Sequence, residues 1–163
     1  MKRIISVLME NEPGALSRVV GLFSQRGYNI DSLNVAPTDD ISLSRLTLTT
    51  ICDDKTIEQI NKQLNKLIDV VKVQDISLGA HIVRELMMIK LRAKESDRAE
   101  VKRCADIFRG QIIDVGANHY TVLVEGDSEK LDGFITAIGD IRVLEVVRSG
   151  VCGIVRSEKA MSI

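Results

Sequence analysis

The spacing of hydrophobic residues changes along the chain in a fixed order. Segments in which apolar and polar residues alternate predict strands, and segments with apolar residues three or four positions apart predict helices with one buried face. In the first half, Leu46 and Leu48 alternate with polar neighbours, whereas Leu16, Val19 and Phe23 have helical spacing. The expected elements there are strands over 2–9, 29–36, 45–49 and 71–74 and helices over 15–26 and 53–67. Their order is βαββαβ.

The same order of elements returns in the second half, from about Arg84 onward. The hexad Arg-Gly-x-x-Ile-Asp occurs at 26–31 and again at 109–114, each time between a helix and a strand. Because the hexad recurs at the same place in the same order of elements, we infer that one unit has been duplicated. The expected elements of the second half are strands over 86–93, 111–115, 120–125 and 143–147 and helices over 96–108 and 128–138.

A βαββαβ order gives an antiparallel sheet with both helices on one face, the ferredoxin-like plan. The sequence therefore predicts an α+β protein made of two ferredoxin-like βαββαβ units. We expect the first unit at 1–78, a linker at 79–83 and the second unit at 84–163, with a mobile tail from Ser149 that has few packing signals. Each sheet leaves an edge strand open, and open edges pair with other strands. We therefore expect a homodimer with a continuous sheet.

Composition argues against several classes of partner. The 163 residues have a formal net charge of −1 and an aromatic content of 3%, so the chain lacks the positive charge and the stacking surface typical of nucleic-acid binding. No apolar run approaches the roughly 20 residues that span a bilayer, and the N-terminus enters a strand instead of a signal peptide. Three separated cysteines, Cys52, Cys104 and Cys152, are typical of reduced thiols. We expect a cytoplasmic protein that binds neither nucleic acid nor membrane.

No combination of residues predicts catalysis or a metal site. His81 and His119 lie in an expected linker and an expected turn, without carboxylates or cysteines at metal-ligand spacing. The sequence also offers no nucleophile–histidine–acid set and no glycine-rich phosphate loop. Cys104 falls on the apolar stripe of its helix, which favours packing over reactivity. The chain is therefore not expected to be an enzyme by itself.

The turn from the first strand into the first helix is the most informative local feature. Pro13 is tolerated at a helix start, and Gly14 lets a ligand come close to the main chain. The free N–H groups of a helix N-terminus attract a small carboxylate. The amide of Asn11 can bind a ligand or cap the helix. This corner therefore predicts either a carboxylate site or a simple helix cap.

The same corner carries a resemblance to a known family. Residues 10–18, Glu-Asn-Glu-Pro-Gly-Ala-Leu-Ser-Arg, resemble the first loop and helix of an ACT domain, the amino-acid-sensing βαββαβ module. Further segments resemble, more specifically, the small regulatory subunit of acetolactate (acetohydroxyacid) synthase, and together they extend over nearly the whole chain. These segments are 23–33, 35–38, 44–45, 85–86, 108–110, 113–115 and 148–150.

The resemblance implies a regulatory role with a catalytic partner. In that family the large subunit holds thiamine diphosphate, a divalent metal such as Mg and the flavin FAD, and condenses pyruvate with pyruvate or 2-oxobutyrate. The small subunit raises this activity and confers feedback inhibition by valine, an end product of branched-chain amino acid biosynthesis. This chain is therefore expected to assemble with a large subunit and to carry no cofactor, no metal and no catalytic residue of its own.

The resemblance also implies an effector site that is shared between two chains. The helix N-terminus would receive the carboxylate of valine, asparagine side chains its ammonium group, and apolar groups its isopropyl group. A structural role in a turn or an edge strand remains an equal alternative for Asn29, and Ser17 and Arg18 are expected to support the helix from its exposed side. The implied residues are Asn11, Gly14, Ala15 and Leu16 of one chain and Asn29 and Ile30 of the other.

Other functions stay open at this point. A free-standing ACT-domain sensor that regulates another enzyme or transcription would share the corner but would not assemble with a synthase. A small ferredoxin-like enzyme such as an acylphosphatase would need an arginine and an asparagine that converge on a phosphate. An RNA-binding ferredoxin-like domain is disfavoured because the expected strands carry few aromatic residues.

Overall fold

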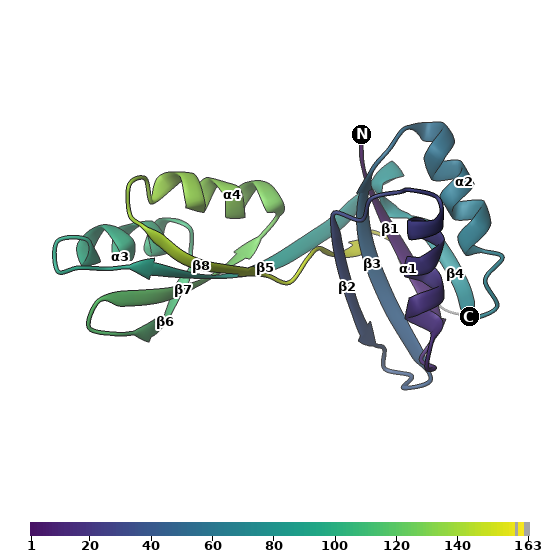
Figure 1. The fold of residues 1–163 in the computed structure, drawn as a ribbon, viewed down its shortest axis with the longest axis horizontal. Helices are drawn as coiled ribbons and strands as arrows, with labels where there is room; N and C mark the ends of the chain where they lie inside the picture. The colour runs from purple at the N-terminus through teal and green to yellow at the C-terminus, as the bar shows by residue number, and fades with distance from the viewer. Residues whose placement is uncertain (159, 162–163) are drawn as a thin grey trace. The chain divides into compact units, whose positions relative to one another are not determined.

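The chain divides into two compact units in the computed structural model, which describes residues 1–158 and 160–161. The first unit combines Met1–Ile82 with the residues from Val151 onward, and the second unit is Val83–Gly150. In Figure 1 each unit consists of an antiparallel sheet with helices packed against it. The predicted α+β class, with two ferredoxin-like βαββαβ units, is confirmed.

The first unit has the predicted order of elements. Its sheet has the strand order β2-β3-β1-β4, and neighbouring strands are antiparallel. The strands β2 and β4 therefore form its edges. The elements are β1 (Lys2–Glu10), α1 (Ala15–Gln25), β2 (Ser32–Pro37), β3 (Leu43–Ile51), α2 (Asp54–Leu64), β4 (Val70–Asp75) and the 3₁₀ turn η1 (Ile76–Leu78).

The core of the first unit lies between this sheet and the helices α1 and α2. Alternate residues of β1 point toward the helices, so Ile5 and Val7 are fully buried there. Phe23 of α1 and Leu64 of α2 pack into the same cluster. Burial of each such side chain stabilises the fold by about 1.5–3 kcal/mol. Both helices thus cover one face of the sheet, as predicted (Figure 1).

The second unit repeats this plan with the strand order β6-β7-β5-β8. Its core joins Met87 and Ile89 of the central strand to Val101 and Phe134 of the two helices. Cys104, 1% exposed, belongs to this core, so its predicted packing role is confirmed. The elements are β5 (His81–Arg92), α3 (Arg98–Ile107), β6 (Gln111–Val115), β7 (His119–Gly126), α4 (Ser128–Ala137) and β8 (Val143–Arg148).

The chain after Gly150 differs from the mobile tail that the sequence predicts. Val151 is 4% exposed, and Cys152–Val155 form the strand β9. The guanidinium of Arg45, on the face of the first sheet opposite the helices, donates to the carbonyl of Gly153 at 3.1 Å. The expectation of an unpacked tail is therefore wrong for 151–155, because this segment finds hydrogen-bond partners in the first unit. The tail residues Lys159, Ser162 and Ile163 lie outside the described residues.

Two element boundaries also differ from those predicted. The strand β5 begins at His81, so of the linker expected over 79–83 only 79–80 precede the strand. The strand β2 begins at Ser32, three residues later than predicted, and Asn29 to Asp31 stay outside regular structure. This irregular segment matters below because it contains two of the predicted site residues.

The repeated hexad marks the end of a helix in both units, but its residues do not adopt matching conformations. The left-handed residue after α1 is Gly27, with φ 69°, whereas the one after α3 is Arg109, with φ 54°. Since Gly27 is the second residue of its hexad and Arg109 the first, the turn is displaced by one residue.

None of the helices formed by the described residues is long and apolar enough to cross a membrane.

Candidate functional site

The corner between β1 and α1 leaves the start of α1 without a side-chain cap. Gly14 occupies the N-cap position with φ 90° and ψ −14°, a left-handed conformation that glycine adopts without steric cost. By contrast, Asp53 caps α2 by accepting a hydrogen bond from the N–H of Thr56 at 2.7 Å. The first turn of α1 also contains no acidic residue. Its main-chain N–H groups and the positive end of the helix dipole therefore suit a carboxylate ligand.

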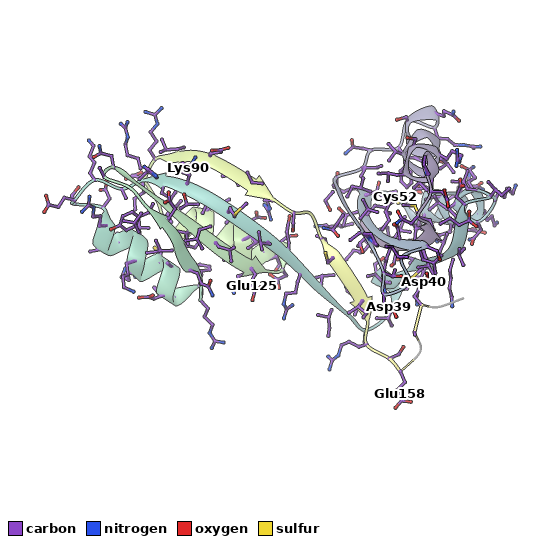
Figure 2. The ribbon with its side chains drawn as sticks, turned by 90° about the horizontal axis from the view of Figure 1, so that it is seen from below. Asp39, Asp40, Cys52, Lys90, Glu125 and Glu158 are labelled. Atoms are coloured by element: carbon purple, nitrogen blue, oxygen red, sulfur yellow. The ribbon has the colours of Figure 1, made fainter. Side chains whose placement is uncertain are left out.

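Asn11 does not cap this helix, so the cap interpretation of its side chain is wrong. Its Nδ2 donates to the carbonyl of Ile41 at 2.9 Å, and its main-chain N–H donates to the carbonyl of Ser42 at 2.7 Å. Both partners lie in the loop between β2 and β3, where Figure 2 labels Asp39 and Asp40. That loop is itself closed by Asp40, whose carboxylate accepts from the N–H of Ser42 at 2.9 Å. Asn11 is thus held across a tight loop, with its side-chain carbonyl left for a ligand.

A hollow of about 220 Å³ lies beside this corner. It brings together three of the predicted residues, Asn11, Ala15 and Leu16, with the edge strand β2. Gly14 instead lines a larger groove of about 640 Å³ between α1 and α2. The smaller hollow is lined by Met9, Glu10, Asn11, Glu12, Ala15, Leu16, Val35, Ala36, Pro37 and Ser44.

Arg18 and Asp69 fasten the corner to the end of the sheet. The Arg18 guanidinium donates through both Nε and a terminal nitrogen to the buried carboxylate of Asp69, the latter at 2.8 Å. The main-chain carbonyl of Asp69 accepts from the N–H of Glu10 at 2.8 Å. The hydrogen bonds from Arg18 hold the pKa of the Asp69 carboxyl below its ordinary value. Arg18 therefore does more than support the exposed side of α1.

The guanidinium of Arg18 also lies over Gly14. A Cβ atom placed on Gly14 would be 2.9 Å from a terminal nitrogen of Arg18, closer than real Cβ contacts. The glycine therefore meets two requirements at once, a positive φ and room for the ion pair. The sequence motif identifies Gly14, but nothing local in the sequence indicates Asp69, which is 51 residues from its partner.

Asn29 and Ile30 lie at the other end of the same sheet. The carbonyl of Asn29 accepts a hydrogen bond from the Thr50 hydroxyl at 2.6 Å, near the end of β3. The corner, by contrast, adjoins the start of β3, since Glu10 pairs with Leu43. The seven residue-to-residue steps from Leu43 to Thr50 correspond to about 23 Å of strand. One chain therefore cannot bring its own Asn29 or Ile30 to its own corner.

The equivalent corner of the second unit has a different chemistry. The N-cap of α3 is Asp97, and its carboxylate accepts from the main-chain N–H of Lys94 at 3.2 Å. Glu100 adds a negative charge in the first turn of α3. A carboxylate ligand would be repelled there, so only the first unit has an N-terminal corner suited to it among the described residues.

Within the described part of the chain, no group of three or more His, Cys, Asp or Glu side chains could hold a metal ion. The cysteines Cys52, Cys104 and Cys152 are free thiols. Burial raises the pKa of the Cys52 and Cys104 thiols, which disfavours the reactive thiolate form.

Two family models and several relatives of this chain share one description. Residues 84–157 match the family model of the small subunit of acetolactate synthase, and residues 5–72 match that of the AHAS small subunit-like ACT domain. Over 162 residues the chain is 58% identical to the acetolactate synthase isozyme 3 small subunit of Escherichia coli, with 99% of each chain covered. The isozyme 3 small subunit of Salmonella typhimurium is 57% identical over the same length and coverage.

A solved structure agrees with these relatives. The crystal structure of an acetolactate synthase small subunit from Thermotoga maritima matches with a TM-score of 0.88 and 36% sequence identity. The match covers 98% of this chain and 99% of that chain. The similarity therefore includes both units and not the N-terminal one alone.

Proposed function

Because this chain belongs to the family of acetolactate synthase small subunits, we propose that it is a regulatory subunit that activates a catalytic large subunit and confers feedback inhibition by valine. Thiamine diphosphate, Mg and FAD would then reside on the large subunit, where acetolactate is made. The role of this chain would be to bind the effector and to change the activity of the large subunit.

The observation that carries the proposal is the uncapped N-terminus of α1 at Gly14. A carboxylate placed there would accept hydrogen bonds from main-chain N–H groups and face the positive end of the helix dipole. The side-chain carbonyl of Asn11, whose Nδ2 is already bound to Ile41, is available to accept from an ammonium group. Leu16 and Val35, which line the adjoining hollow, suit a short branched side chain.

A second copy of the chain would complete this site. Asn29 and Ile30 are about 23 Å along the strand from the corner of their own chain, so their participation requires a partner. Pairing through the open edge of β2 supports such a dimer, because edge strands present unpaired main-chain groups. An apolar pocket of this kind discriminates by only about 1–3 kcal/mol per methylene. Some response to leucine and isoleucine is therefore expected beside that to valine.

Inhibition would follow from valine binding more tightly to one arrangement of the dimer than to another. A ligand shifts such an equilibrium only by the difference between its affinities for the two states. A tenfold loss of synthase activity requires about 1.4 kcal/mol of this coupling. A site shared between two chains meets the requirement, because any change in the interface changes the site.

The test is to mix the full chain with its large subunit and to follow acetolactate while valine is titrated. We expect the chain to raise the activity of the large subunit and to make it sensitive to valine. Valine binding without any effect on the synthase would instead indicate a free-standing amino-acid sensor. Failure of both stimulation and valine sensitivity would overturn the proposal.

A further inference from the structure

The predicted site residues Asn29 and Ile30 belong to a segment that the end of β3 holds in place. The segment has no regular structure between the end of α1 and the start of β2. The N–H of Asp31 donates to the main-chain carbonyl of Thr49 at 2.8 Å. The hydroxyl of Thr50 donates to the carbonyl of Asn29 at 2.6 Å. The second of these bonds comes from a side chain, so a substitution can remove it without altering the strand.

Thr50 is itself rigidly placed. Thr50 is only 1% exposed, and in the β1–β3 pair it lies directly opposite Arg3. Arg3 is 4% exposed and forms ion pairs with Asp54, the first residue of α2, and with Asp75 at the end of β4. The buried guanidinium of Arg3 thus ties β1 to the buried carboxylate of Asp75 in β4 and to the exposed carboxylate of Asp54 in α2, beside Thr50. Figure 2 labels Cys52, two residues further along the chain from Thr50.

The side chain of Asn29 is oriented from the same anchor. Its Nδ2 donates to the carboxylate of Asp31 at 2.9 Å, while its carbonyl is held by Thr50. With the main chain and the amide nitrogen both bound, the amide oxygen of Asn29 is presented in one direction. The side chain of Ile30 follows from the same fixed main chain and packs against the core of the first unit.

We infer that Thr50 is a positioning residue of the effector site, because its hydroxyl fixes Asn29 and Ile30 for contact with a ligand held by the neighbouring chain. The inference rests on the proposed function and adds a residue that does not touch the effector. Removal of the hydroxyl leaves the Asn29 carbonyl without this donor and lets the segment move. We expect valine affinity to fall about three- to tenfold, the usual effect of one lost hydrogen bond.

The test uses the full chain with Thr50→Val, which removes the hydroxyl and keeps the shape, and Thr50→Ser, which keeps the hydroxyl. Valine binding is measured by calorimetry, and activation and half-inhibition are measured with the large subunit. We expect weaker binding and a higher valine concentration at half-inhibition for Thr50→Val, full maximal activation, and near-normal values for Thr50→Ser. The matched control is Thr47→Val, at a buried residue of the same strand on the opposite face of the sheet.

The outcomes separate this inference from the proposed function. Normal valine affinity in Thr50→Val would overturn the positioning role, and so would equal weakening by Thr50→Ser or by Thr47→Val. If Thr50→Val does not fold, Thr50→Ala with circular dichroism as a check replaces it and must show the same loss. Absence of valine binding by the unmodified chain would overturn the proposed function itself.

Discussion

Gly14 has a positive φ and leaves room for the Arg18 guanidinium, so substitutions at this residue test the effector site most directly. We expect Gly14→Asp to lose valine binding by more than about tenfold, because it places a negative charge where the carboxylate would sit. Gly14→Ala should weaken binding less while costing about 1–2 kcal/mol in stability, since its φ of 90° strains any residue with a Cβ. Calorimetry with valine and urea unfolding of each variant measure the two effects.

The control for these variants lies in the same helix. Gly21 has open space where a Cβ would be added, so Gly21→Ala should raise stability by up to about 1 kcal/mol and leave valine binding unchanged. Activation of the large subunit should survive in Gly14→Asp, because the added charge, the strain and the contact with Arg18 all lie at this corner of the first unit. Normal valine affinity in Gly14→Asp would remove the corner from the site.

The ion pair between Arg18 and Asp69 predicts a specific dependence of stability on pH. Arg18 lowers the pKa of Asp69 in the folded chain, so the pair stabilises the fold fully above the ordinary aspartate pKa of about 3.9. This stabilisation is lost as the pH falls from about 3.9 through the lowered pKa of Asp69 in the folded chain. Asp69→Asn should therefore be less stable than the unmodified chain at pH 7, and the difference should shrink below about pH 4. Thermal unfolding at pH 7, 5 and 3 measures it.

An exposed pair supplies the comparison for Asp69. Glu58 and Lys62 lie one turn apart on the surface of α2, where ion pairs contribute little. Glu58→Gln should change the unfolding temperature much less than Asp69→Asn does at pH 7. Equal effects of the two substitutions would show that the Arg18–Asp69 pair has no special role in holding the corner.

For single residues, the sequence predicts roles that depend on the residue's own backbone or side chain, but not the residues distant in sequence that contact it in the fold. Gly14 follows from the Pro-Gly motif, because a positive φ and close ligand approach are properties of the residue itself. Asp69 and Thr50 are ordinary residues in sequence, and their roles arise only when the sheet brings them to residues 51 and 21 positions away. The resemblance to the family indicated the ligand contacts and not the residues that hold those contacts in place.

Among the elements, the short strand β9 gives the clearest prediction. Arg45 donates to the Ser6 hydroxyl at 3.0 Å and to the Gly153 carbonyl at 3.1 Å, so it joins β9 to the first sheet. Arg45→Met should loosen this segment, which keeps its pairing with β5, and lower the stability of the first unit by about 1–3 kcal/mol. Hydrogen exchange should become faster at Gly153 to Val155, and urea unfolding should report the lower stability.

An arginine on the second unit serves as the control for Arg45. Arg103 pairs with Glu100 on the exposed face of α3, so Arg103→Met should leave both exchange and stability nearly unchanged. Unchanged exchange at Gly153 to Val155 in Arg45→Met would show that other contacts hold β9.

The elements with strong periodicity were predictable, and the short or interrupted ones were not. The stripes Val19–Phe23 and Ile57–Leu64 predicted α1 and α2, because burial against one sheet face imposes the helical period on the sequence. β9 has four residues, pairs with β5 and accepts one hydrogen bond from Arg45, so its pattern alone carries too little information. Likewise β5 extends back to His81, through residues 81–83 that were expected to belong to the linker.

In the molecule as a whole, two units with the same order of elements differ at the start of their first helix. Both have the βαββαβ order, yet the first has an uncapped glycine at its first helix and the second has Asp97 there, followed by Glu100. A carboxylate effector is thus favoured in one unit and repelled in the other. The two halves of the proposed site also lie at opposite ends of one sheet, which is why a second chain is needed.

This division of the site between chains predicts that two inactive variants restore each other. Gly14→Asp destroys the corner, and Asn29→Lys, at an exposed residue, places a positive charge where the ammonium group would approach. Each variant alone should form dimers in which both sites are defective. In a mixed dimer one site receives both defects, whereas the other combines an intact corner with an intact Asn29 and Ile30. After unfolding and refolding of an equal mixture, about half of the dimers should be mixed and about a quarter of all sites should bind valine.

Calorimetry on the mixture measures this fraction against each variant refolded alone. A mixture that binds no more valine than its components would show that the two groups of residues do not meet across a dimer, and the shared site would have to be abandoned.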